Sequence, residues 1–479
     1  MASIPLVYAD TPPPQIAVSE RVEADRSTRR PVLLFFHSAV VWLLVGSVLG
    51  LVASLKFQFP DWLTGQAVLT FGRVRAAHLN AVAYGWASMA LVGVAVWMIP
   101  RLVRAPLHRP VVATAAAAGW NLFLVLGLGA ILAGWTDGLE WLEIPYPIDA
   151  IVAVAGGLMA TSVLVTVARR KTKHFYVSVW YALAALVWFP ILFVTANLPV
   201  WSGVGQAAVN WWYGHNTLGL WITSLSLAAA YYLIPKVLGR PIRSYWLSLV
   251  GFWALAFFYS LNGIHHLIGG PVPTWLVTVS ITASVMMVIP VAATAVNFHT
   301  TMAGRFGTLR HSPTLAFTVA GAMIYTAVSL QGSVEALRTV NRVTHFTHFT
   351  VGHAHLGVYG FASMIAFGAM YFIVPRLVNW EWPRPALIRW HFWLALTGIA
   401  IYFVALTIGG WLEGAWMLDP AKPFAAVVDV TRPYLVARSV GGTLMLAAHC
   451  VFAYHYWLMV RRRGPERQEP AWSDGRAAG

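Results

Sequence analysis

Long apolar stretches separated by short polar segments dominate the pattern of this sequence. An α-helix needs about 20 apolar residues to cross the hydrocarbon core of a bilayer, and twelve stretches come close to or exceed that length. They lie near residues 31–55, 76–100, 112–134, 149–168, 175–197, 206–235, 245–268, 274–298, 313–334, 349–375, 387–412 and 434–460. The pattern predicts an all-α, polytopic membrane bundle of twelve transmembrane helices over residues 31–460, between an N-terminal tail (1–30) and a C-terminal tail (461–479).

Composition supports a membrane protein that sits in a lipid bilayer. Hydrophobic residues make up 58% of the chain and charged residues only 10%, whereas a soluble domain carries about 25% charged residues. Both tails are polar, which is typical of disordered or docking segments. The first apolar run begins only after residue 30, so no cleavable signal sequence is evident, and we see no internal repeat.

The distribution of Lys and Arg gives the orientation. Most of the 32 basic residues lie in the two tails and in the connections after the second, fourth, sixth, eighth and tenth stretches. Basic residues favour the cytoplasmic side of a membrane, so both termini are expected in the cytoplasm. The net charge of +15 therefore reflects topology, and a nucleic-acid partner has no support.

Histidines at hydrocarbon depth are the candidate chemistry. Ionisable residues inside a membrane are costly and rare, so they mark functional sites, and neutral imidazole is a good ligand for iron and copper. A single buried histidine is more often a hydrogen-bonded packing residue, and we leave His391, His449 and His455 with that interpretation. Six histidines at this depth are candidate metal ligands: His78, which stands alone and could equally be a packing residue, and the grouped His215, His265, His266, His353 and His355.

Helix geometry sorts these six residues. At about 100° per residue, His353 and His355 point to roughly opposite faces of one helix, which could then hold a haem on each side. His265 and His266 diverge by about 100°, so both can reach one ion that His215 approaches from another helix. Three imidazoles without a carboxylate or thiolate favour copper, or else non-haem iron, with a position left open.

The cysteine count restricts where electrons come from. Cys450 is the only cysteine, so the chain carries no C-x-x-C-H haem attachment site, disulfide or iron–sulfur motif. Electrons must therefore arrive from a partner. Basic residues on the outer side are candidates to bind haem propionates, since guanidinium groups pair well with carboxylates; they include Arg73 and Arg75 before His78, Arg338 and Arg342 before His353, and Arg438 at the start of the last helix.

Five segments carry a resemblance to a known family. They are FGRVRAAH (71–78), WWYGHNTLG (211–219), YYLIPKVLGRP (231–241), FWALAFFYSLNGIHHL (252–267) and TVNRVTHFTHFTVGHAHLG (339–357). From about residue 30 to 460 the chain resembles the catalytic subunit of haem-copper oxygen reductases of the C-type, or cbb3-type, cytochrome c oxidases. The resemblance implies the twelve-helix fold of that family, two b-type haems, one copper ion and dioxygen as substrate. It also implies coupling to proton translocation, a bacterial inner membrane and membrane-anchored c-type cytochrome partners.

The resemblance also assigns roles to residues. His78 and His355 would bind the low-spin haem, His353 would be the proximal ligand of the high-spin haem, and His215, His265 and His266 would hold copper. His345 would lie next to a propionate of the high-spin haem. Tyr231 and Ser248 match positions on a proton route from the cytoplasm.

Tyr259 distinguishes the subclasses. A- and B-type oxidases carry a tyrosine four residues after the first copper histidine, where this chain has Gly219. Tyr259 lies seven residues before His266, two helical turns away on the same face of one helix, so it can reach the copper site from the neighbouring helix. The resemblance implies a covalent link from Tyr259 to His215. The alternative is an interior aromatic that only packs and hydrogen-bonds.

Some positions depart from the family pattern. Gln331 stands where a glutamate is usual, with Glu335 one turn later, and His348 stands where an aspartate is usual. The segment Gly357-Val358-Tyr359-Gly360 looks more like nitric oxide reductases. These departures leave the proton exit and the propionate contacts open, and they suggest a divergent branch.

Two other functions remain to be distinguished. Nitric oxide reductases keep the six histidines but hold non-haem iron, with a glutamate four residues after the first metal histidine. Here that residue is Gly219, and no acid occurs between His215 and Lys236. A transporter with metal-binding histidines is the third hypothesis, and it would show no b-type haem spectrum.

Overall fold

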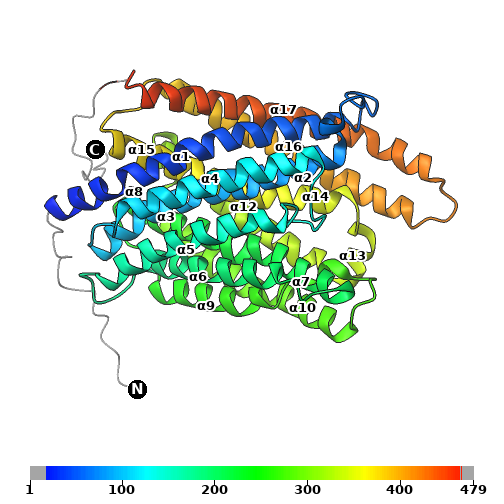
Figure 1. Cartoon of the computed structure of the whole chain (residues 1–479), viewed down its shortest axis with the longest axis horizontal. Coiled ribbons are helices and arrows are strands. Elements are labelled where there is room, and N and C mark those ends of the chain that lie inside the picture. Colours follow the sequence, from blue (N-terminus) through cyan, green and yellow to red (C-terminus); the bar gives the residue numbers. More distant parts are fainter. Residues whose placement is uncertain (1–17, 464, 466–479) are drawn as a thin grey trace.

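The computed structural model describes residues 18–463 and 465, and these residues form helices without a β-strand. Twelve helical spans are long and apolar enough to cross a membrane, and they run side by side along the long axis (Figure 1). Nine of these spans form the outer layer of the bundle. They are α1 (Val18–Leu55), α4 (Pro110–Ala133), α5 (Tyr146–Ala168), α6 (Val177–Asn197), α9 (Tyr245–Ser260) with η4 (Ile264–Leu267), α10 (Thr274–Met286) with α11 (Val288–Met302), α12 (Pro313–Glu335), α16 (Pro385–Met417) and α17 (Phe424–Val460).

Each of the other three spans is interrupted by a π-helical segment. They are α2 (Phe71–Asn80) with η2 (Ala81–Ala87) and α3 (Ser88–Val103), α7 (Gly203–Asn216) with η3 (Thr217–Thr223) and α8 (Ser224–Leu238), and α14 (His348–His355) with η6 (Leu356–Ser363) and α15 (Met364–Val378). Their apolar windows are 94%, 89% and 89% buried, against at most 56% for every other span. These three spans are therefore the core of the bundle. Short helices η1 (Ala67–Leu69), η5 (Phe306–Arg310) and α13 (Arg338–Thr344) lie between spans.

The core spans repeat one local design. Each contains a π-helical segment, η2, η3 or η6, just after a candidate metal-ligand histidine. A serine follows or ends each segment, and its hydroxyl donates to the carbonyl five residues earlier: Ser88 to Ala83 at 2.7 Å, Ser224 to Gly219 at 3.2 Å, and Ser363 to Val358 at 2.9 Å. Such π-helical turns are rare and concentrate at functional sites.

This design corrects the expectation that the chain has no internal repeat. The core spans are the second, sixth and tenth, so the pattern recurs every four spans. Each also ends after a proline, at Pro100, Pro235 and Pro375, whose carbonyl accepts the N–H of a left-handed capping residue. The repeat shares few residues, because lipid contact and packing accept many apolar side chains, and it is therefore hard to see in the sequence.

The predicted N-terminal tail is too long. Helix α1 begins at Val18, so residues 18–30 continue the first span as helix. Buried Asp25 pairs with Arg101 at 2.5 Å, and Glu20 pairs with Arg104 at 2.9 Å, which holds this extension against α3 and the residue after it. The predicted C-terminal tail begins where α17 ends. The remaining tail residues, 1–17, 464 and 466–479, lie outside the described part of the chain.

Helices α16 and α17 are, like the 38-residue α1, much longer than a bilayer is thick. Helices α16 and α17 contain 33 and 37 residues, which corresponds to about 50 and 55 Å against about 30 Å of hydrocarbon. Their connected ends project beyond the rest of the bundle (Figure 1). The start of α1 and the end of α17 lie together at the opposite end (Figure 1), as an even number of spans requires.

Candidate haem and copper centres

The structure brings three predicted copper ligands together. His215 comes from α7 and His265 and His266 from η4, and their candidate ligand atoms all lie within 4.8 Å of one another. His265 Nδ1 is 3.0 Å from Ser280 Oγ, and His266 stacks on Trp211 with ring centroids 4.5 Å apart. His215 Nδ1 is buried without a hydrogen-bond partner among the described residues. A buried nitrogen without a partner inside an all-imidazole cluster fits copper.

The route by which Tyr259 reaches this cluster differs from the prediction. Helix α9 ends at Ser260, and His265 and His266 lie on a separate 3₁₀ turn. Tyr259 and His266 therefore do not share the face of one continuous helix. Gly263, with φ +115°, makes the break, and a Cβ there would lie 2.5 Å from the carbonyl oxygen of Trp211. The close approach of this turn to α7 requires glycine.

Tyr259 nevertheless lies beside His215. Their ring centroids are 4.9 Å apart and the rings are tilted by 34°. Gly219 makes room for the phenol, because a Cβ at that position would lie 1.8 Å from Tyr259 Cε1. The ring of Tyr259 from α9 thus occupies the space that a side chain at 219 would need.

His78 and His355 face each other across a gap that suits a haem iron. Their rings are nearly parallel, at 11°, with centroids 6.1 Å apart. This separation fits two metal–imidazole bonds of about 2 Å with half a ring on either side. His78 Nδ1 is 2.7 Å from the carbonyl of Gly46, and His355 Nδ1 is 2.8 Å from that of Val351. Each Nδ1–H donates to a carbonyl, so Nε2 is the candidate ligand atom of each ring, and that of His355 lies 3.3 Å from the Tyr402 hydroxyl.

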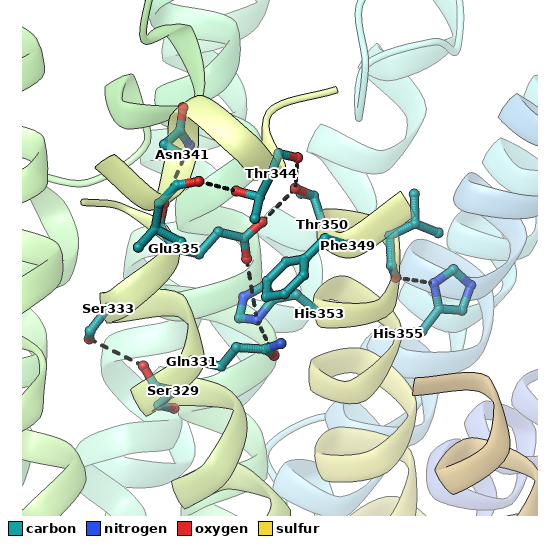
Figure 2. Close-up of polar contacts among 12 residues, drawn as sticks. Ser329, Gln331, Ser333, Glu335, Asn341, Thr344, Phe349, Thr350, His353 and His355 are labelled. Atoms are coloured by element: carbon teal, nitrogen blue, oxygen red, sulfur yellow. Dashed lines mark hydrogen bonds and ion pairs between the residues drawn. The ribbon is translucent and has the colours of Figure 1, made fainter. Parts of the chain in front are cut away.

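His353 points to the other side of the same span, as the sequence predicts (Figure 2). Its Nδ1 lies 3.2 Å from Gln331 Oε1 and 3.9 Å from Glu335 Oε2, both on α12. Glu335 also accepts a hydrogen bond from the Thr350 hydroxyl (Figure 2). His353 is close enough to interact electrostatically with each of the three clustered histidines. This arrangement fits a proximal ligand that α12 orients.

The candidate propionate residues divide into two groups. Arg75 and Arg438 interact electrostatically with His78, and buried Arg438 also donates to the Tyr402 hydroxyl at 3.1 Å. Arg75 forms an ion pair with Glu140. Arg73 instead donates to the carbonyl of Leu132 at 3.0 Å, at the end of α4, so only its other donors are left for a propionate.

Histidines 345 and 348 lie at the same end of the bundle. His345 interacts electrostatically with His266, and burial lowers the pKa of His345. His348 Nδ1 lies 2.8 Å from Glu413 Oε2 on α16. The carboxylate missing at position 348 is thus supplied from a neighbouring helix, which the sequence did not reveal.

Buried hydroxyls mark the candidate proton route. Tyr231 and Ser248 are both fully buried, and the Ser248 hydroxyl donates to the Tyr245 carbonyl at 2.5 Å. The Tyr231 hydroxyl has no hydrogen-bond partner among the described residues, although Thr294 and Asn297 lie beside it. Among the other buried hydroxyls without a partner in the described part of the chain, sequence reasoning missed those of Tyr181, Thr294 and Tyr325.

Tyr325 links this group to the metal site. It lies within electrostatic range of both Tyr231 and Tyr259. The group of unpartnered hydroxyls therefore extends from Tyr231 toward Tyr259. Buried hydroxyls of this kind require water or one another as partners, which is the environment that proton transfer needs.

Glu143 is another residue that sequence reasoning missed. It lies in the connection between α4 and α5 and is 4% exposed. Asn80, two residues after His78, donates to Glu143 Oε2 at 2.9 Å, while Oε1 has no partner among the described residues. Burial raises the pKa of Glu143 to about 7, against the lowering effects of the Asn80 hydrogen bond and of Arg75.

A twelve-helix bundle with opposed imidazoles and a three-histidine cluster defines a membrane oxidoreductase of the haem-copper class. The sequence pattern of the family described as "Cytochrome C and Quinol oxidase polypeptide I" matches residues 30–444, and the chain belongs to this family. A cbb3-type cytochrome c oxidase subunit from Stutzerimonas stutzeri is 32% identical over 91% of this chain and 96% of its own length.

A second curated relative and a solved structure agree. Cytochrome c oxidase subunit 1 of Rhodobacter capsulatus is 33% identical over 88% of this chain and 84% of its own length. A solved structure of a haem-copper terminal oxidase dimer aligns with a TM-score of 0.74 at 15% identity, covering 95% of this chain and 85% of that one. This likeness confirms the predicted fold, and the family confirms the recognition of a haem-copper oxygen reductase of the cbb3 kind.

Proposed function

We propose that this chain reduces dioxygen to water at a site made of a high-spin haem and copper. The observation that carries the proposal is the Tyr259 phenol beside His215, in the space left by Gly219. Electrons would enter from c-type cytochrome partners through a low-spin haem, and the reaction would be coupled to proton translocation. The cytochrome c oxidase activity named for the relatives supports this assignment.

The residues divide the work among the cofactors. His78 and His355 would hold a low-spin haem b, His353 a high-spin haem b, and His215, His265 and His266 one copper ion. When bound, these groups supply dioxygen binding and most of the electrons. Tyr259 would supply one further electron and the proton of its hydroxyl, and Gln331 would orient His353 by accepting from its Nδ1–H.

Tyr259 would be joined covalently to His215. If Nδ1 of His215 binds copper, Nε2 is the nitrogen left for a bond to the phenol ring, whose centroid lies 4.9 Å from that of the imidazole. Forming the bond removes two hydrogen atoms, and dioxygen at the site is the oxidant that accepts them.

The proton route and the surroundings complete the proposal. Protons would pass from the cytoplasm along Tyr231 and Ser248 toward Tyr259, supported by the unpartnered hydroxyls between them. The chain would span a bacterial inner membrane as a domain over residues 31–460 with both termini cytoplasmic. The basic residues at that side support this orientation.

Nitric oxide reduction is disfavoured by the same geometry. A glutamate at position 219 would collide with Tyr259, since even a Cβ would lie 1.8 Å from the ring. A metal-binding transporter is excluded as the main function by membership of the oxidase family.

Metal and haem analysis of the purified enzyme tests the proposal. We expect two b-type haems and one copper per chain, loss of the low-spin spectrum in His78→Ala or His355→Ala, and near-zero copper with haem retained in His265→Ala. Tyr259→Phe should keep all cofactors and lose oxygen reduction by orders of magnitude. Iron in place of copper, or near-native activity of Tyr259→Phe, would contradict the proposal.

A further inference from the structure

His449 is a buried histidine that joins three helical elements. It lies on α17, is 4% exposed, and both of its ring nitrogens have partners. Nδ1 is 2.6 Å from Ser47 Oγ on α1, and Nε2 is 3.0 Å from the Tyr359 hydroxyl on η6. Packing alone does not require both polar atoms of an interior ring to be satisfied from two different elements.

The hydrogen bonds have a definite direction. The Ser47 hydroxyl donates to the carbonyl of Leu43 at 2.6 Å, so its oxygen is left to accept from His449 Nδ1–H. His449 Nε2 then carries no proton and accepts from the Tyr359 hydroxyl. A neutral His449 with its proton on Nδ1 therefore satisfies all of these hydrogen bonds.

Both partners of His449 are next to the axial ligands of the low-spin site. Ser47 follows Gly46, whose carbonyl accepts from His78 Nδ1 at 2.7 Å. Tyr359 lies about one turn after His355 on the same span. His449 therefore connects the backbone that orients one axial imidazole with the helix that carries the other.

We propose that His449 is a positioning residue that sets the mutual orientation of the two axial histidines and thereby the reduction potential of the low-spin haem. This inference rests on the proposed function, because it takes His78 and His355 as haem ligands. A hydrogen bond from the second ring nitrogen makes a ligating imidazole more basic and fixes its plane. Loss of the Ser47 contact would free Gly46 to shift and weaken that bond to His78.

The chain offers a matched control in His391. This residue is fully buried on α16 and bonds the Tyr371 hydroxyl at 2.9 Å, on the same core span as Tyr359. Tyr371 lies more than about three turns further toward the cytoplasmic end than Tyr359. His391→Phe thus removes the same kind of buried histidine–tyrosine bond far from the axial ligands.

The test compares His449→Phe and His391→Phe in the purified enzyme. We expect His449→Phe to retain both haems, to change the electron paramagnetic resonance signal of the oxidised low-spin haem, and to raise its midpoint potential, because a less basic His78 stabilises the ferric state less. His391→Phe should leave signal and potential unchanged. His449→Gln, which keeps a donor and an acceptor, should restore part of the native potential.

Two outcomes would overturn the inference. One is a native signal and potential in His449→Phe, and the other is an equal shift in His391→Phe. If His449→Phe does not fold, Tyr359→Phe and Ser47→Ala each break one of the two bonds and should each shift the potential in the same direction. Absence of any low-spin haem in the native enzyme would instead refute the proposed function.

Discussion

Gly219 shows how a single missing side chain decides which helix supplies the redox tyrosine. Gly219 and Tyr259 come from neighbouring spans and share one small volume beside His215. Glycine is therefore needed here for the space it leaves. Its backbone is helical, within η3, so no left-handed conformation requires it. The chemistry of the site depends on what this residue lacks.

Gly219→Ala should displace the Tyr259 ring. A Cβ at 1.8 Å from the phenol carbon cannot be accommodated without movement, and overpacking of this kind costs about 1–3 kcal/mol. We expect the histidine–tyrosine crosslink to be absent in a mass spectrum of a digest and oxygen reduction to fall by orders of magnitude. Gly205→Ala, on the same span with open space around its Cβ position, should change neither; an intact crosslink in Gly219→Ala would contradict the steric argument.

Glu143 provides a prediction for pH. Burial raises its pKa from 4.5 to about 7, so between these values the folded protein holds a proton that the unfolded chain releases. Stability should therefore fall as pH rises from 4.5 through 7, by about 3 kcal/mol in total. Glu143→Gln should remove this fall and leave a higher melting temperature at pH 8, but not at pH 4, measured by thermal unfolding in detergent.

Glu140→Gln is the matched control for that measurement. Glu140 lies in the same connection, but its side chain is 32% exposed and pairs with Arg75, so its replacement should keep most of the fall in stability that buried Glu143 causes. Equal slopes for native protein and Glu143→Gln would show that Glu143 is not a buried acid in the folded state.

At the scale of elements, indole–serine hydrogen bonds join the core spans. Trp86 on η2 donates to the Ser363 hydroxyl at 2.8 Å, and Trp221 on η3 donates to Ser88 at 2.9 Å. The related place on η6 is taken by Phe361, which cannot donate and packs against Tyr325 with ring centroids 4.9 Å apart. The indole–serine bond is therefore present at two of the three corresponding positions. At the third position, Phe361 lies next to Tyr325 on the candidate proton route.

Trp86→Phe should destabilise the core without affecting lipid contacts. It removes the indole donor to Ser363 and leaves a gap, which together cost about 1–3 kcal/mol. We expect a lower melting temperature in detergent, and the same direction for Trp221→Phe. Trp253→Phe, at a side chain that is 60% exposed on the outside of the bundle, should have little effect; equal melting temperatures for Trp86→Phe and native protein would show that this bond adds nothing.

Elements also show what the sequence could predict. Length and hydrophobicity were enough for the twelve spans, because a bilayer imposes a minimum apolar length on every helix that crosses it. The opposed directions of His353 and His355 followed from helical spacing. The end of α9 at Ser260 did not, since the break depends on Gly263 fitting closely against Trp211. The π-helical segments depend on serine bonds to backbone that many sequences would allow.

At the scale of the whole molecule, the candidate cofactor ligands lie on the most buried spans. The three interrupted spans are the most buried, and they carry His78, His215, and the pair His353 and His355. The remaining spans surround them and face lipid with about half of their residues. The polar groups of the metal sites are therefore kept away from hydrocarbon, where an unpaired polar group would cost several kcal/mol.

The projecting hairpin of α16 and α17 is where we expect the whole molecule to meet its electron donors. These helices exceed the bilayer thickness at the end opposite the described termini (Figure 1). Their tip exposes Met417, Leu418 and Phe424, with Phe424 73% exposed. Exposed apolar side chains beyond the membrane are typical of protein contact surfaces.

Polar replacement of the tip should therefore release the partners. If c-type cytochrome partners copurify with the native chain, as the proposed function requires, we expect the triple variant Met417→Gln, Leu418→Gln, Phe424→Ser to lose most of that c-type haem, because its docking contacts are removed. The b-type haem and copper should stay constant, since the six histidines lie in spans or turns away from the tip. Phe306→Ser, at an exposed phenylalanine in the basic connection after α11, is the control and should keep the full c-type content. Unchanged c-type haem in the triple variant would place the partners on another surface.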